Sequence, residues 1–546
     1  MTSLAEKRYF SHPGWSRLGD IALVLCVLLA GTVVPRFMLS GGWPGDDGYY
    51  AFWAQWIHHN LVNGQGLPDA GGLLLYPILV SWVFYFDYNP FVALRFIDLG
   101  MATLAAFFLY RIVNLESGSK AGAALIVLVF TFTMNQYTFV TFGFKNSITI
   151  AFIPLFLAIH IGQNIVHNKQ TETGVNWLAA GALTALAVVL RETFVPFAVL
   201  GLVSVFIMRG RKAAFHFFLG GVIAGVLLIG GILIARGSVS GAIEGYRVAG
   251  YTLISAPGTQ IMDNFFDYGL LAIQSSSKAL MISALAGFIL MAIAVTRQNK
   301  RILSGLLFWL CFAGIALIEP ATKICFEYHF AVALPGLAGL CALAFREIAR
   351  ECAHFSWANH KTRDAILLMG VFLFALWYSS VLLSGTRHML PITLETLTLA
   401  PNNEWPEVIH QAGSFLSVGD EIKKLIPEDG TLSVNRNAEL FFPFTGRLPP
   451  SSQLANLSAL GFKTGFSVPR IKEALLACAP DAILMNSYED WLNGYGSNQQ
   501  LLTAILETGI YDVALEMRFE KEGSSSDDDI TVTLFKKTKE TTCLES

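Results

Sequence analysis

The chain has 546 residues, of which 54% are hydrophobic and only 14% charged, and its mean hydropathy is +0.53. Soluble domains carry about a quarter charged residues, so this composition indicates a polytopic membrane protein. The net charge of −3 and the lack of a dense basic run give no indication of a nucleic-acid partner. The seven cysteines show no CxxC or Cys/His spacing, which argues against a zinc site and against a disulfide framework.

About eleven apolar segments are long enough, or nearly so, to cross a bilayer. They are 18–39, 90–110, 121–138, 147–164, 177–191, 193–208, 213–235, 277–296, 302–318, 330–345 and 364–385. No small-residue cleavage site follows the first segment, so we expect it to be an anchor. A further apolar stretch, 71–86, is interrupted by Pro77. We expect it to form an interfacial or re-entrant helix on the outer side.

The distribution of Lys and Arg orients these segments. With the N-terminus in the cytoplasm, most basic clusters fall on the cytoplasmic side: Lys7–Arg8, Arg209–Lys212, Lys300–Arg301 and Arg346–Arg350. This arrangement satisfies the positive-inside rule, and counting 71–86 as a span would reverse it. We therefore predict a multi-pass protein of the inner (plasma) membrane, with loop 237–275 and the C-terminal tail extracytoplasmic.

The composition becomes that of a soluble domain near Arg387. Helix-like and strand-like segments alternate from there on: 418–426, 431–435, 468–479, 482–485, 499–508, 511–519 and 530–535. Such alternation predicts a small α/β domain. We expect a transmembrane domain over 1–385 and a soluble extracytoplasmic α/β domain over 386–546, which caps or shapes an outer site.

The most informative polar feature is the sequence Gly-Asp-Asp-Gly-Tyr-Tyr at residues 45–50, directly after the first span. It places Asp46 and Asp47 on the outer side of the membrane. Two adjacent carboxylates at a membrane surface repel each other and are costly to desolvate, so a functional role is favoured. The structural alternative is an ordinary turn, for which Asp-Asp-Gly is also suitable.

The residues that follow the acidic pair are rich in aromatic and histidine side chains. Trp53 and Trp56 are typical of a helix that lies in the membrane interface, and we expect them to anchor it there. His58 and His59 are neighbours on this expected helix and face different directions, so a metal site formed by them is not favoured.

Three further groups of polar residues are predicted on or near the outer side. Arg95 and Asp98 stand three residues apart inside one span, where an opposite-charge pair reduces its own burial cost. Arg191 and Glu192 come at the outer end of another span. The third group, in the loop after 318, consists of Lys323, Glu327, Tyr328 and His329.

Acidic and basic residues of this kind suit glycosyl transfer from a lipid phosphate. The reaction removes a proton from an acceptor hydroxyl, for which a carboxylate is a suitable base, and a second carboxylate raises its pKa into a useful range. The leaving group is a phosphate, whose developing charge is stabilised by Arg, Lys or His.

Several short motifs resemble those of the C-type (GT-C) membrane glycosyltransferases. They are the acidic pair followed by Tyr-Tyr-Ala-Phe-Trp-Ala, the stretch Leu75–Phe86 with Phe91–Phe96, and Glu327–Phe330 with Leu334-Pro335. The nearest branch looks like the bacterial relatives of protein O-mannosyltransferases and the lipid A aminoarabinose transferase. The resemblance implies a mainly α polytopic GT-C-like fold.

The same resemblance implies a function and a set of site residues. The protein would move a sugar from a polyprenyl-phosphate donor to an envelope lipid, glycan or protein on the extracytoplasmic face. Asp46 would be the catalytic base, with Asp47 supporting or substituting for it. Residues implied for the donor phosphate are Arg191, Lys323 and His329. Residues implied for substrate binding are Tyr49, Tyr50, Arg95, Glu192, Glu327 and Tyr328. Members of this branch differ in their need for a divalent metal, and the sequence leaves that requirement open.

Two other classes of protein stay open at this stage. A secondary transporter would show repeated halves and ionisable residues near the bilayer midplane, and only the Arg95–Asp98 pair points that way. A non-catalytic partner in envelope polysaccharide assembly would tolerate replacement of both aspartates.

Overall fold

The computed structural model describes two compact units of the chain. The described residues are 45–68, 75–86, 88, 90–120, 122–124, 126–127, 146–167, 172–236, 239, 243, 261–275, 277–297, 300–322, 327–354, 398, 415–435, 441–451, 454–465, 467–486, 498–519 and 530–540. Unit 1 contains 1–41, 95–229 and 261–394, and unit 2 contains 42–94, 230–260 and 395–546. The expected spans 18–39 and 364–385, and most of 121–138, lie outside the described residues.

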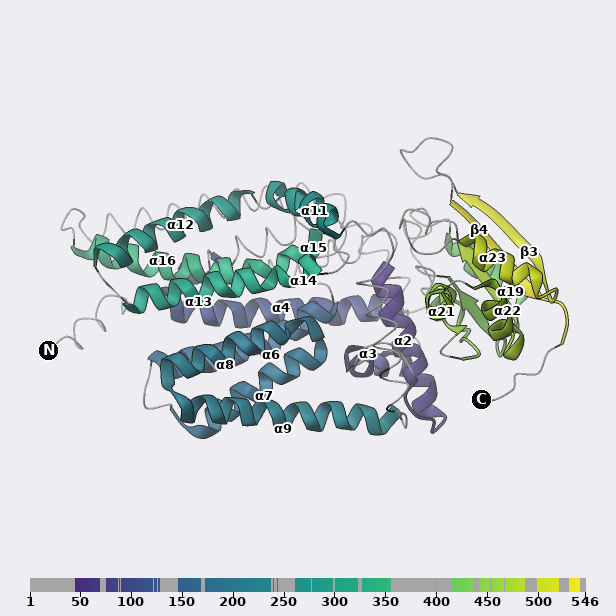
Figure 1. Cartoon of the computed structure of the whole chain (residues 1–546), viewed down its shortest axis with the longest axis horizontal. Coiled ribbons are helices and arrows are strands. Elements are labelled where there is room, and N and C mark those ends of the chain that lie inside the picture. The colour runs from purple at the N-terminus through teal and green to yellow at the C-terminus, as the bar shows by residue number, and fades with distance from the viewer. Residues whose placement is uncertain are drawn as a thin grey trace. The chain divides into compact units, whose positions relative to one another are not determined.

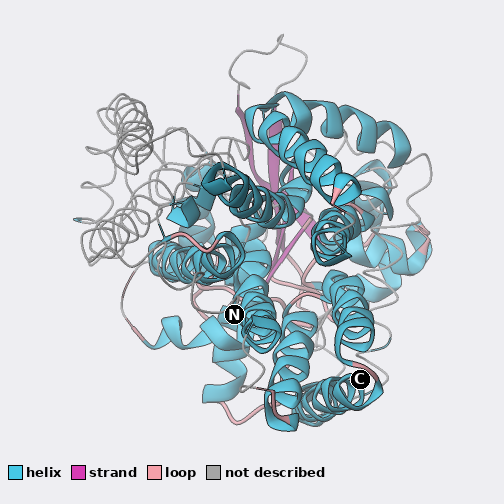
Figure 2. Ribbon diagram, turned by 90° about the vertical axis from the view of Figure 1, so that its left-hand side faces the viewer, coloured by secondary structure: helices cyan, strands magenta, loops and turns pink. Residues whose placement is uncertain are grey.

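Unit 1 is helical throughout its described part. Its helices are α4 (Pro90–Ser117, in unit 1 from Arg95), α6 (Asn146–His167), α7 (Gly174–Leu190), η3 (Glu192–Phe194), α8 (Val195–Arg209), α9 (Arg211–Arg236, in unit 1 to Ile229), α11 (Ile261–Ser275), α12 (Ser277–Thr296), α13 (Lys300–Ala316), α14 (Ile318–Thr322), α15 (Glu327–Phe330), η4 (Ala331–Ala333) and α16 (Leu334–His354). The long helices run in nearly the same direction, and the end-on view shows them as rings (Figures 1 and 2).

Small residues and local signals set the helix boundaries and contacts in unit 1. Thr173 caps α7 by accepting a hydrogen bond from the Asn176 N–H at 3.2 Å. Gly210 ends α8 with a φ of +82°, a conformation that L side chains avoid, so the chain turns into α9 within one residue. A Cβ atom on Gly181 would clash with the carbonyl oxygen of Phe217, so glycine permits the close approach of α7 and α9.

Four helical segments among the described residues are long and apolar enough to cross a membrane. They are Ile150–His167, Glu192–Arg209, Arg211–Arg236 and Ile302–Thr322. Each coincides with a segment expected from the sequence to span. The stretch around Pro77 forms α3 (Leu75–Val80) and η1 (Ser81–Tyr85), which together are shorter than the roughly 20 residues a spanning helix needs.

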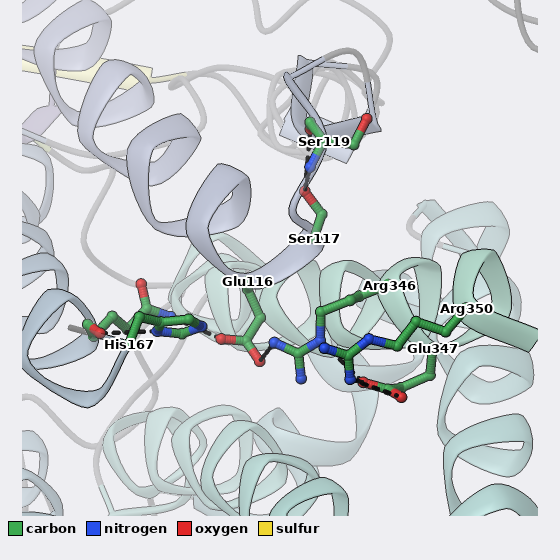
Figure 3. Close-up of polar contacts among 8 residues, drawn as sticks. Glu116, Ser117, Ser119, His167, Arg346, Glu347 and Arg350 are labelled. Carbon is green, nitrogen blue, oxygen red and sulfur yellow. Dashed lines mark hydrogen bonds and ion pairs between the residues drawn. The ribbon is translucent and has the colours of Figure 1, made fainter. Parts of the chain in front are cut away.

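A network of charged side chains joins α4, α6 and α16 at one end of unit 1 (Figure 3). Glu116 accepts a hydrogen bond from Gln163 at 3.1 Å, and its other oxygen lies 3.7 Å from Arg346. Arg346 and Arg350 both donate to Glu347, at 3.0 and 3.1 Å. Both glutamates are buried. We call these five residues the α16 network.

Unit 2 combines N-terminal helices with a C-terminal sheet. Its elements, besides the ends of α4 and α9, are α2 (Gly45–Val62), α3, η1, α19 (Phe415–Leu425), β1 (Leu432–Val434), α20 (Phe441–Thr445), α21 (Leu457–Thr464), α22 (Val468–Ala477), β2 (Ala482–Asn486), α23 (Asn498–Glu507), β3 (Tyr511–Phe519) and β4 (Ile530–Lys537). The strand order is β1-β2-β4-β3, with β1 and β2 parallel and the other pairs antiparallel. The helix-like and strand-like segments expected after 415 are therefore present.

Two hydrophobic cores lie on opposite faces of this sheet, because strand side chains alternate between the faces. On one face Ile483, Met485 and Phe535 pack with residues of α21, α22 and α23. On the other face Leu432, Leu484 and Leu534 pack with residues of α19, α20 and α2.

The aromatic residues of α2 belong to the second core, which corrects one expectation. Trp53 and Trp56 were expected to anchor a helix in the membrane interface. They are buried, with 6% and 9% of their surfaces exposed, and belong to the same core cluster as C-terminal residues. Tryptophan is typical both of interfaces and of cores, so its presence did not distinguish the two.

Cys478, at the end of α22, is disulfide-bonded. The irregular cysteine spacing argues against a framework of disulfides, and a bonded Cys478 is compatible with that prediction.

Candidate functional site

Arg191 occupies a one-residue break between two helical segments of unit 1. Its backbone is extended, with φ −152° and ψ 108°. Its N–H still donates to the carbonyl oxygen of Ala187 at 3.0 Å, and its own carbonyl accepts from Phe194 at 3.0 Å. Arg191 therefore closes α7 and begins η3, and its guanidinium is held at this end of α7.

Glu319 and His329 come from the two short helices that follow α13. Arg191 donates a hydrogen bond to Oε1 of Glu319, and His329 Nε2 lies 3.7 Å from the same oxygen. The side chains of Arg191, Glu319 and His329 are 12%, 5% and 5% exposed. We call these three residues the ion triad. All three lie in or beside short segments between long helices, where the chain changes direction.

Aromatic side chains form a continuous row in the part of unit 1 that carries the ion triad. Phe194, three residues after Arg191, contacts Phe152 of α6 and Phe197 of α8, with ring centroids 5.1 and 5.2 Å apart. Phe197 in turn contacts Phe312 of α13 at 4.6 Å. All four rings are buried. An apolar surrounding of this kind lowers the local dielectric and strengthens charge–charge interactions.

The ion triad has the composition of an anion-binding group. A guanidinium and an imidazole converge on one carboxylate oxygen, so a protonated His329 gives the triad one excess positive charge. Arginine binds carboxylate and phosphate in the same fork-like geometry. The triad is therefore chemically suited to hold a phosphate group close to an apolar wall.

The acidic pair begins a helix in unit 2. Asp46 and Asp47 lie in the first turn of α2, where negative charge interacts favourably with the helix dipole. Their backbone therefore does not form the turn considered as the structural alternative. Their side chains lie outside what the structure describes.

Other predicted site residues of unit 2 take part in aromatic contacts. Tyr49 contacts Trp53, with ring centroids 6.0 Å apart, and Tyr50 contacts Tyr76 of α3 at 5.1 Å. His58 meets the ring of Tyr85 edge-on at 4.3 Å. Among the residues that the structure describes, no group of three or more His, Cys, Asp or Glu side chains could hold a metal ion.

The remaining predicted site residues of unit 1 are only partly described. Glu192 is exposed in η3. Glu327 and Tyr328 lie in α15 and Arg95 in α4, but their side chains, like the whole of Lys323, are outside the described part. Of the residues predicted for the donor phosphate, the structure therefore brings Arg191 and His329 together.

Sequence reasoning did not identify Glu319 as a member of this site. The signal that was available is a glutamate followed by Pro320 directly after an apolar span, in the loop that also carries His329. A carboxylate at such a position is costly unless it has a cationic partner. The sequence could not say that this partner is Arg191, which is 128 residues away.

Comparison of the whole chain with known proteins identifies its fold. No family model and no curated protein matches the sequence. The crystal structure of ArnT from Cupriavidus metallidurans bound to undecaprenyl phosphate matches with a TM-score of 0.54 and 12% identity, over 96% of this chain and 98% of ArnT. The apo ArnT structure matches with a TM-score of 0.55 and 12% identity, over 95% and 98%.

These matches show that the chain has the fold of a GT-C membrane glycosyltransferase. That particular fold is the fold of ArnT, the lipid A aminoarabinose transferase, so the resemblance expected from the sequence is confirmed at the level of fold. Together with the four apolar helices among the described residues, it identifies the chain as a membrane protein.

Proposed function

We propose that this protein is an integral-membrane glycosyltransferase that moves a sugar from a polyprenyl-phosphate donor to an envelope lipid, glycan or protein. The observation that carries the proposal is the ion triad, in a chain that shares the fold of ArnT over 96% of its length. The matched ArnT structure is bound to undecaprenyl phosphate, a ligand of the chemistry that a guanidinium and an imidazole would recognise.

The proposed reaction needs a base for the acceptor hydroxyl and cations for the leaving phosphate. The acceptor hydroxyl attacks the anomeric carbon of the donor sugar while the bond between that carbon and the phosphate oxygen breaks. Asp46 takes the hydroxyl proton. Asp47 raises the pKa of Asp46 or acts as the base in its place. The polyprenyl phosphate leaves with the bonding electrons, and its charge is stabilised by Arg191, His329 and Lys323.

Two observations support an extracytoplasmic location for this chemistry. The Lys and Arg residues follow the positive-inside rule when the C-terminal tail is placed outside. Cys478 of the C-terminal part is disulfide-bonded, and such bonds persist mainly in oxidising compartments outside the cytoplasm.

Replacement of the acidic pair tests the proposal. We expect Asp46→Asn to lower product formation by about two to four orders of magnitude, the usual contribution of general base catalysis. Asp47→Asn should cost less. Product is measured by mass spectrometry of envelope glycolipids, glycans and glycoproteins from cells with equal amounts of each variant. Binding of undecaprenyl phosphate to the purified protein in nanodiscs should be unchanged.

Equal and small effects of the two substitutions would contradict the enzyme and favour a transporter or a non-catalytic partner. A larger loss at Asp47 than at Asp46 would keep the enzyme and exchange the two roles.

A further inference from the structure

Helix α2 is buried on several of its sides. Ala51, Phe52, Ala54 and Ile57 are each no more than 1% exposed, although they point in different directions around the helix. A helix at a membrane or protein surface keeps one polar face, whereas a helix that is hydrophobic all round is buried inside a protein. Within unit 2, α2 is therefore a core element.

The residues that share a core with α2 come from the far end of the sequence. The Phe52 ring stacks on Phe442 of α20, with centroids 4.3 Å apart and an angle of 27° between the rings. Both side chains are no more than 1% exposed. Val418 and Ile422 of α19 belong to the same core cluster. Segments nearly 400 residues apart in the sequence thus complete one core.

A second contact fixes α2 through its N-terminal turns. Tyr50 meets Tyr76 of α3 edge-on, with ring centroids 5.1 Å apart. The helix is thereby held between α3 and the α20 side of the core.

We infer that the C-terminal α/β domain holds α2 and thereby positions the acidic pair for the reaction. Phe442 and Phe52 are positioning residues in this arrangement. Asp46 lies six residues before Phe52 on the same helix, a rise of about 9 Å along the axis. A small tilt of α2 at the Phe52–Phe442 contact therefore moves the carboxylates away from the reacting atoms. A misplacement of about 1 Å can cost on the order of a hundredfold in rate.

This inference rests on the proposed function, and the chain offers a matched control. Phe535 is 1% exposed and Phe442 0%, and both belong to the C-terminal sheet domain. Its side chain lies in the core on the opposite face of the sheet, with α21 to α23 and without α2. Phe442→Ala and Phe535→Ala remove the same group at similar burial, and only the first touches α2.

The experiment compares both variants in the full-length protein. We expect Phe442→Ala to lower product formation per folded molecule by about 10- to 100-fold, and to speed amide hydrogen exchange in the peptide covering α2. Phe535→Ala should leave both quantities unchanged. Binding of undecaprenyl phosphate should be the same in both variants, because the ion triad belongs to unit 1. Phe442→Leu keeps most of the apolar volume and should recover most of the product, so a folding failure of the alanine variant is recognised.

The outcomes separate this inference from the proposed function. Equal loss of product in the two alanine variants, or unchanged exchange of α2 in Phe442→Ala, overturns the positioning role while Asp46→Asn stays inactive. Full activity of both Asp46→Asn and Asp47→Asn instead overturns the proposed function itself.

Discussion

The ion triad and the α16 network are two buried charge clusters in the same unit, and they differ in charge balance. In the triad, Arg191 and His329 meet the same carboxylate oxygen of Glu319. In the network, two glutamates meet two arginines. The network neutralises itself, whereas the triad gains an excess positive charge when His329 is protonated.

The two clusters also lie at opposite ends of the helices. Arg191 follows α7, whose 17 residues rise about 25 Å from the end near Gln163. Similarly, Arg346 comes twelve residues into α16, roughly 18 Å from its start beside His329. We expect the network to fix neighbouring helices and the triad to bind an anion. Burial alone does not distinguish them, because the carboxylates of both clusters are buried.

The largest expected difference is between Arg191→Gln and Arg346→Gln. Loss of Arg191 should lower product formation by about two to three orders of magnitude, as removal of a group that stabilises transition-state charge does, and should weaken undecaprenyl phosphate binding. Loss of Arg346 should instead destabilise the fold by about 3 kcal/mol, because Glu116 and Glu347 stay buried without it. Product per folded molecule and thermal unfolding in detergent measure the two effects. Equal loss of product per folded molecule would remove the distinction.

Neutralising both partners of each pair sharpens the comparison. A buried ion pair replaced by neutral groups is often close to neutral in stability. Glu116→Gln added to Arg346→Gln should therefore restore thermal stability, with product unaffected. Glu319→Gln added to Arg191→Gln should restore stability and leave product low. Recovery of product in the second double variant would show that Arg191 acts only as the partner of Glu319.

The smallest effect is expected at a balanced but more exposed pair in unit 2. Asp481 lies 2.9 Å from Lys537 and accepts hydrogen bonds from Thr431, and its side chain is 37% exposed. Burial acts to raise the pKa of Asp481, but the hydrogen bonds from Lys537 and Thr431 outweigh it, so the pKa lies below its ordinary value. The contribution to stability is therefore present above the unfolded carboxyl value, about 3.9, and is lost as pH falls through the lower folded value.

Asp481→Asn should accordingly cost no more than about 1 kcal/mol at neutral pH, because solvent screens a pair of this exposure. Hydrogen exchange of the β1 and β2 amides, corrected for the intrinsic rate at each pH, measures this cost. The difference from the wild type should fade as the pH drops below about 3.9. If the difference persists at lower pH, the stability cost of Asp481→Asn comes from packing and not from charge.

Much of the fold was predictable because it depends on local patterns. Long apolar runs predicted α6, α8, α9 and α13 within a few residues, since a bilayer requires helices of about 20 apolar residues. The alternation of apolar and polar residues and the turn residues are also local patterns, and they predicted the C-terminal strands. The predicted strand Tyr511–Phe519 has both its ends correct. The phosphate-binding roles that we propose for Arg191 and His329 rest on a family resemblance and on their predicted location outside the membrane.

What the sequence could not decide is which distant residues meet. It determined that this is a membrane chain with many helices, an acidic pair after the first apolar segment and a C-terminal part with helices and strands, because each of these is written in neighbouring residues. Only the tertiary structure brought Glu319 to Arg191, and Trp53 and Phe52 into one core with Phe442. Such contacts depend on how separate elements pack, and an apolar helix has the same local pattern whether lipid or protein covers it.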